Sequence, residues 1–108
     1  MMIAVIMTLD ERTQMYVELR TEVLLFAYAM EQKLRKNDHK GGWKNRTNGE
    51  LWHKFHGEIR EFDEAMINRA TNDPRPILME AVDIANYSMM IADNSGALEN
   101  YSEEIKIK

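Results

Sequence analysis

Two pairs of acidic residues carry the clearest chemistry in this sequence. Glu58 and Glu61 are three residues apart, and Glu80 and Asp83 repeat the spacing further along the chain. On a helix this spacing places both members of a pair on one face, one turn apart. Glu58 borders the apolar stripe of its segment, and the second pair interrupts a segment that is otherwise apolar. Carboxylates in such surroundings need a basic partner, a proton or a cation.

A divalent cation is the compensation that the sequence favours. The two acidic segments contain only four basic residues, and none of them shares the face of the first acid pair: Lys54, Arg60, Arg69 and Arg75. Oxygen-only ligands favour magnesium, or manganese in its place, over zinc. The predicted metal ligands are Glu58, Glu61, Glu80 and Asp83. The alternative is an ordinary solvated helix face, since the E-x-x-E spacing is common on helices.

Other chemistry is excluded by missing residues and motifs. The chain has no cysteine, so disulfides, thiolate metal sites and a cysteine nucleophile are ruled out. Its three histidines show no zinc-binding spacing, and no glycine-rich nucleotide-binding motif is present. The formal net charge of −4 argues against general nucleic-acid binding. No segment approaches the length of a membrane span, and the apolar run over residues 1–7 lacks signal-peptide features, so we expect a cytoplasmic protein.

Three long helices must position the acids. The first is expected from about Leu9 to Lys36, after a capping box formed by Thr8 and Glu11. Its apolar stripe recurs every three or four residues: Tyr16, Leu19, Val23, Phe26, Met30 and Leu34.

The boundaries of the other two helices are marked by capping signals. The second helix is expected from Thr47 or Asn48 to about Ala70, with Thr47 and Glu50 as a second capping box. The third is expected to begin at Asp73 and Pro74, to continue to about Asp93 and to stop at Gly96. Residues 97–108 are compatible with either a short helix or an extended arm.

The expected fold class is all-α, because no clear strand and hairpin pattern is present. Residues 1–108 would form one domain: a bundle of three long helices with a short C-terminal segment. The third helix is apolar almost all round, and a chain of this size can hardly cover it. We therefore expect a homodimer or homotetramer that buries this surface between subunits.

The ordered acid pairs resemble the signature of the MazG-like all-α nucleoside triphosphate pyrophosphohydrolases. The first matching segment reads Leu51-x-x-x-Phe55-x-Gly57-Glu58-Ile59-x-Glu61-Phe62-x-x-Ala65, and the second reads Glu80-Ala81-Val82-Asp83-Ile84-Ala85-Asn86-Tyr87. The basic loop before them, which contains Trp43, is similar to that of small phage-encoded members. The resemblance covers about residues 9–95.

The resemblance implies magnesium-dependent cleavage of a nucleoside triphosphate between its α and β phosphates, releasing the monophosphate and pyrophosphate. Such an enzyme would clear non-standard, damaged or surplus nucleotides. The four acids would hold magnesium, and Glu61 would also orient the attacking water. Residues placed to contact the substrate are Lys40, Lys44 and Arg46 at phosphates, Trp43 and Tyr87 at the base, and Asn86 at the sugar, the base or a water.

Less specific roles stand beside each of these predictions. The basic loop residues suit a solvated charge run, Trp43 suits a staple that packs the loop on the bundle, and Tyr87 suits the core. Two other functions also fit the sequence. One is a nucleotide-binding module without turnover, and the other is a small helical interaction protein with no ligand.

Overall fold

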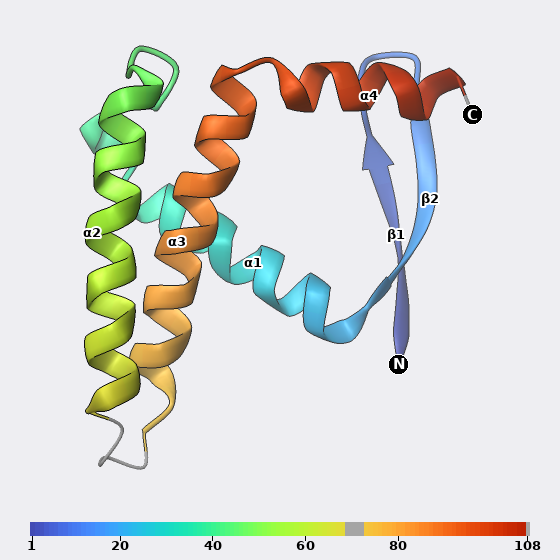
Figure 1. Cartoon of the computed structure of the whole chain (residues 1–108). Coiled ribbons are helices and arrows are strands. Elements are labelled where there is room, and N and C mark those ends of the chain that lie inside the picture. The colour runs from blue at the N-terminus through green and yellow to red at the C-terminus, as the bar shows by residue number, and fades with distance from the viewer. Residues whose placement is uncertain (69–72, 108) are drawn as a thin grey trace.

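The computed structural model describes residues 1–68 and 73–107 of the chain. Two strands are followed by four α-helices (Figure 1). The elements are β1 (Met2–Thr8), β2 (Gln14–Arg20), α1 (Thr21–Lys36), a 3₁₀ turn η1 (Asp38–Lys40), α2 (Asn48–Ile67), α3 (Arg75–Asn94) and α4 (Ala97–Ile107). The fold is therefore mixed, and the prediction of an all-α class is wrong.

An antiparallel β-hairpin occupies the region that the sequence analysis assigned to the start of the first helix. β1 and β2 pair along their whole lengths, from Met2 opposite Arg20 to Thr8 opposite Gln14. Burial alternates residue by residue in both strands, as expected for a two-sided ribbon. Tyr16 and Leu19 fit a helical stripe by spacing, but the pairing with β1 satisfies their backbone groups and imposes a period of two. The long first helix is thus confined to α1.

The proposed capping box at Thr8 and Glu11 is replaced by a hairpin turn. The Leu9 N–H donates to the Thr13 carbonyl at 2.9 Å and closes the turn. The Asp10 carboxylate accepts hydrogen bonds from the N–H groups of Arg12 at 2.8 Å and Thr13 at 2.7 Å. An aspartate that binds the backbone two and three residues ahead stabilises a tight turn and competes with helix initiation.

The predicted start of α2 is confirmed. The Thr47 hydroxyl accepts a hydrogen bond from the Glu50 N–H at 3.1 Å, which satisfies one of the free donors at the helix N-terminus. The helix ends at Ile67, and the end expected near Ala70 lies outside the described residues.

The boundaries of α3 follow the predicted signals closely. Pro74 is the N-cap of α3, one residue later than expected, and the Asp73 carboxylate accepts a hydrogen bond from the Arg75 N–H at 3.0 Å. Gly96 has a φ of 84°, a left-handed conformation that glycine adopts without strain, and it ends the helix as predicted. Of the two alternatives for the tail, the helix is observed, as α4.

The packing centre lies between α2 and α3, which run side by side in opposite directions (Figure 1). Leu51 of α2 and Val82 of α3 are completely buried, and they are the only described hydrophobic side chains classed as buried. α1 contacts α3, and α4 continues from the end of α3 toward the hairpin. Among the described residues, no helix has the length and apolar character needed to cross a membrane.

Truncation of the central leucine tests this packing. Leu51→Ala should lower the free energy of unfolding by about 2–5 kcal/mol, because it removes a fully buried side chain from the α2–α3 contact. The volume-conserving change Leu51→Met should cost less than about 1.5 kcal/mol. Urea denaturation followed by circular dichroism measures both. Equal and small losses for the two variants would contradict this placement of the core.

Candidate metal centre

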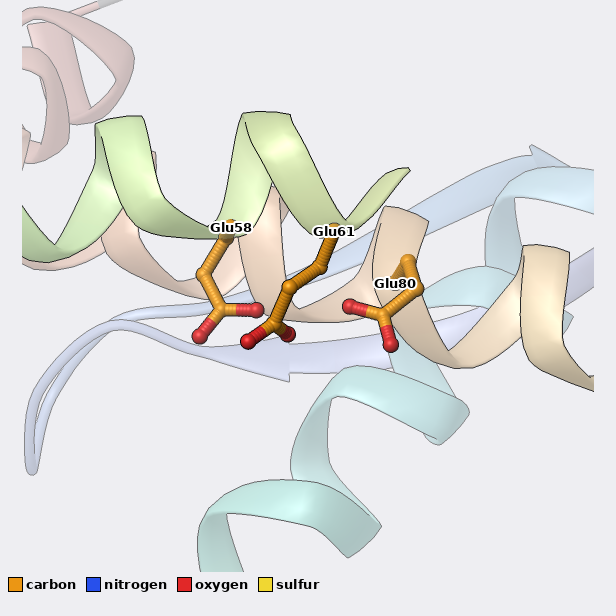
Figure 2. Close-up of side chains that lie close together, drawn as sticks. All are labelled: Glu58, Glu61 and Glu80. Atoms are coloured by element: carbon orange, nitrogen blue, oxygen red, sulfur yellow. The ribbon is translucent and has the colours of Figure 1, made fainter. Parts of the chain in front are cut away.

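Three carboxylates from two helices converge at one point. Glu58 and Glu61 extend from consecutive turns of α2, and Glu80 extends from the facing side of α3 (Figure 2). One carboxylate oxygen from each lies within 4.8 Å of the others. Because α2 and α3 are antiparallel, the end of α2 lies beside the beginning of α3. Residues that are far apart in the sequence are therefore close together in space.

The surroundings of these acids fit a cation. Glu58 Oε2 and Glu80 Oε2 are buried, and neither has a hydrogen-bond partner. Buried carboxylate oxygens without partners are costly, and such groups in proteins are usually paired or bound to a metal. Within residues 1–68 and 73–107, no basic side chain forms an ion pair with Glu58, Glu61 or Glu80. Three carboxylates suit a hard divalent cation such as magnesium.

Crowding raises the proton affinity of the cluster. Burial, together with the negative charges of Asp83, Glu61 and Glu80, raises the pKa of Glu58 to about 7. Burial and the neighbouring Glu61 also raise the pKa of Glu80. Two carboxylates are therefore held where their ionised forms are unfavourable in the absence of positive charge.

Asp83, the fourth predicted ligand, lies next to the cluster and not within the group of three. Its Oδ1 is 3.5 Å from Lys33 Nζ of α1. Burial raises the pKa of Asp83, while the charge of Lys33 acts in the opposite direction. Lys33 is a functional candidate that the sequence analysis missed, because only the bases on the two acid-bearing helices were considered there. Lys33 lies on α1, and no pattern of sequence spacing connects a residue of that helix with Asp83.

A pocket of about 150 Å³ opens beside Asp83. It is bounded by the C-terminal part of α1, the following loop and the second half of α3. Five of the six predicted substrate contacts line it: Lys40, Trp43, Arg46, Asn86 and Tyr87. Lys33 and Asp83 line it too, whereas Glu58, Glu61 and Glu80 do not. Glu61 and Glu80 line a separate pocket with Glu64, Ala65, Asn68, Asp73, Pro76 and Ile77. Tyr87 follows Asp83 by one turn of α3, and burial together with the charge of Glu58 raises the pKa of its phenol.

The loop over the pocket is held by the end of α3. Trp43 Nε1 donates to Asp93 Oδ2 at 2.8 Å, and the Asn94 side-chain amide donates to the carbonyls of Trp43 at 2.8 Å and Arg46 at 3.2 Å. Lys44 forms an ion pair with Asp93 and does not line the pocket. The structure thus gives Lys44 a carboxylate partner where a phosphate contact was predicted, and Asp93 and Asn94 are positioning residues that the sequence analysis did not identify.

Asn86 is the buried polar residue of the pocket, with 4% of its surface exposed. Its Nδ2 donates to the Met30 carbonyl at 3.2 Å, which ties α3 to α1. Its Oδ1 is buried without a partner. Because this oxygen is an acceptor with no donor, it can receive a hydrogen bond from a ligand or a water in the pocket.

The raised pKa of Glu58 predicts how the stability of the metal-free protein depends on pH. The folded state holds the Glu58 proton up to about pH 7, whereas an unperturbed glutamate loses it near 4.5. The resulting stabilisation is present at low pH and is lost as the pH rises through about 7. In EDTA, the Tm should therefore fall as the pH rises from about 4.5 to about 7 and level off above that range. Thermal unfolding followed by circular dichroism measures this fall.

A substitution of Glu58 and the addition of magnesium test whether Glu58 causes the fall in Tm. Glu58→Gln should flatten the fall in Tm, whereas the exposed Glu104→Gln should leave it unchanged. Magnesium should raise the Tm more at the higher pH, because protons compete with the cation for the carboxylates. A fall of equal size in wild type and Glu58→Gln would show that other groups cause it.

Comparisons of the chain with models of protein families, with curated proteins and with solved structures gave no match. The resemblance to the MazG-like enzymes therefore remains an expectation from the sequence motifs. The features of this chain that bear on a function are the converging acids, their unpartnered oxygens and the pocket beside Asp83.

Proposed function

We propose that this protein is a magnesium-dependent nucleoside triphosphate pyrophosphohydrolase, which cleaves between the α and β phosphates to give a monophosphate and pyrophosphate. The observation that carries the proposal is the convergence of Glu58, Glu61 and Glu80, with Asp83 standing between this cluster and a pocket that has basic and aromatic walls. Acids that would hold a cation, next to a pocket that carries basic side chains, are complementary to a metal–triphosphate complex.

Each part of the site has a role in this proposal. Glu58 and Glu80 would hold the cation with their unpartnered oxygens. Bound magnesium supplies positive charge that offsets the phosphate oxygens and the charge developing in the transition state. Glu61 is the most exposed of the three acids, so it can reach water and accept a proton as that water attacks phosphorus.

The pocket is suited to the nucleoside end of the substrate. Its volume of about 150 Å³ is below the roughly 300 Å³ at which pockets enclose whole small-molecule ligands. A base or sugar would be enclosed, and the phosphates would extend past Asp83 toward the acids. Trp43 offers a ring whose orientation is fixed by its bond to Asp93, so stacking on a base loses little side-chain freedom. Lys40 and Arg46 provide charge for phosphate oxygens at the rim.

The Lys33–Asp83 ion pair gives the site a second arrangement. For Asp83 to serve as a fourth ligand, its 3.5 Å pairing with Lys33 must open. Lys33 already lines the pocket, so its ammonium group is then available to the triphosphate. Such an exchange would conserve charge pairing, because Asp83 would face a cation in place of Lys33, and Lys33 would face a phosphate in place of Asp83.

Pyrophosphate release from a panel of nucleoside triphosphates tests the proposed activity. The wild-type protein should release pyrophosphate with magnesium and none with EDTA. Glu61→Gln should lower kcat by about 10²–10⁴-fold, the usual contribution of a general base, with an unchanged circular dichroism spectrum. Asp63→Asn is the matched control, because Asp63 is an exposed acid on the same helix.

The outcomes separate the proposed enzyme from the alternatives. Nucleotide binding without any turnover would show a binding module built on the same pocket. No rise in Tm with magnesium and nucleotide together would leave only a helical interaction protein, since a ligand bound to the native state must stabilise it.

A further inference from the structure

The β-hairpin has one face that is apolar throughout. Three directly opposed pairs cover it: Ile3 with Leu19, Val5 with Val17, and Met7 with Met15. The opposite face is mixed and includes Glu18 and Arg20. A ribbon with one uniformly apolar face normally buries that face against another layer, because two-stranded hairpins are at best marginally stable in water.

The rest of the described chain covers this hairpin only in part. The six side chains of the apolar face are each partly exposed, and the opposite face is exposed throughout, including the apolar Ile6. Among the described elements, only α1 approaches the strands along its backbone. α4 reaches the hairpin turn through an ion pair, with Lys106 Nζ 2.6 Å from Asp10 Oδ2. In Figure 1 the strands stand apart from α2 and α3, and α1 and α4 bridge the two parts at opposite ends. The packing centre at Leu51 and Val82 therefore lies away from the hairpin.

The single chain also exposes far more surface than its mass requires. Its accessible surface is 8538 Å², whereas a compact monomer of 12.7 kDa exposes about 6,200 Å². The radius of gyration is 16.0 Å, against about 13 Å for a compact chain of this length. The surplus of about 2,300 Å² per chain exceeds the roughly 800 Å² that each partner buries in a standard interface.

We infer that a second copy of this chain covers the apolar face of the hairpin. A surplus of this size matches the large interfaces of obligate homo-oligomers, whose subunits complete one another's cores. A two-fold axis would complete the burial of the six partly exposed apolar side chains of each copy at once and so use the surplus on both chains. The second copy also offers exposed apolar side chains of its own on α1: Val23, Leu25 and Tyr28. The inferred interface shares no residue with the acid cluster, so it does not depend on the proposed activity.

Placing charge on either side of strand β2 tests this interface. Light scattering coupled to size exclusion should give the wild type at least twice the 12.7 kDa chain mass at micromolar concentration. Val17→Asp should reduce the mass to that of one chain, because a carboxylate would face apolar groups. Tyr16→Asp is the matched control: the adjacent side chain is 83% exposed and points to the opposite face, so the oligomer should persist.

A milder substitution keeps the test decisive if Val17→Asp does not fold. Val17→Thr is nearly isosteric and keeps the preference for a strand, but it buries one hydroxyl per chain in the interface. It should raise the dissociation constant measured by analytical ultracentrifugation at least tenfold, whereas Tyr16→Thr should not. A monomeric wild type would overturn the inference. So would a dissociation constant that is unchanged by Val17→Thr, or equally raised by Tyr16→Thr.

Discussion

The repulsion among desolvated carboxylates is the constraint on which the site depends. Glu58, Glu61 and Glu80 are brought together by the packing of α2 on α3, and that packing is held by Leu51 and Val82. The apolar contact opposes the electrostatic cost, which is visible in the raised pKa of Glu58 and Glu80. A divalent cation would turn this unfavourable arrangement into a stabilising one, so that the acids and the helix pair support each other.

α3 links the acids to the pocket. Along one helix it carries Glu80 and Asp83 at the acids, then Asn86 and Tyr87 at the pocket wall, and finally the residues that hold the basic loop. Because one rigid element fixes all of these positions, the distance between the acids and the loop is set by helix geometry. Asn86 and Asp83 also connect α3 to α1, and α1 forms a third side of the pocket.

The hairpin shows why helical spacing over a few residues gave the wrong prediction for the start of the first helix. Tyr16, Leu19 and Val23 are spaced as on a helix, yet the first two belong to β2 and the third to α1. Tyr16 is 83% exposed, so its apolar character gave no information about its own chain's core. Strand pairing depends on a partner segment and on the turn between them, and helical spacing over a few residues does not exclude it.

The sequence alone determined the features that depend on neighbours within one helical turn. These are the start of α2 at Thr47, the stop of α3 at Gly96 and the shared face of Glu58 and Glu61. Tertiary structure alone decided the pairing of β1 with β2 and two ion pairs, Lys33 with Asp83 and Lys44 with Asp93. The physical reason is that helix caps and turns form through hydrogen bonds between residues close together in the sequence. The strand pairing and the two ion pairs join residues that only the packing of whole helices and strands brings together.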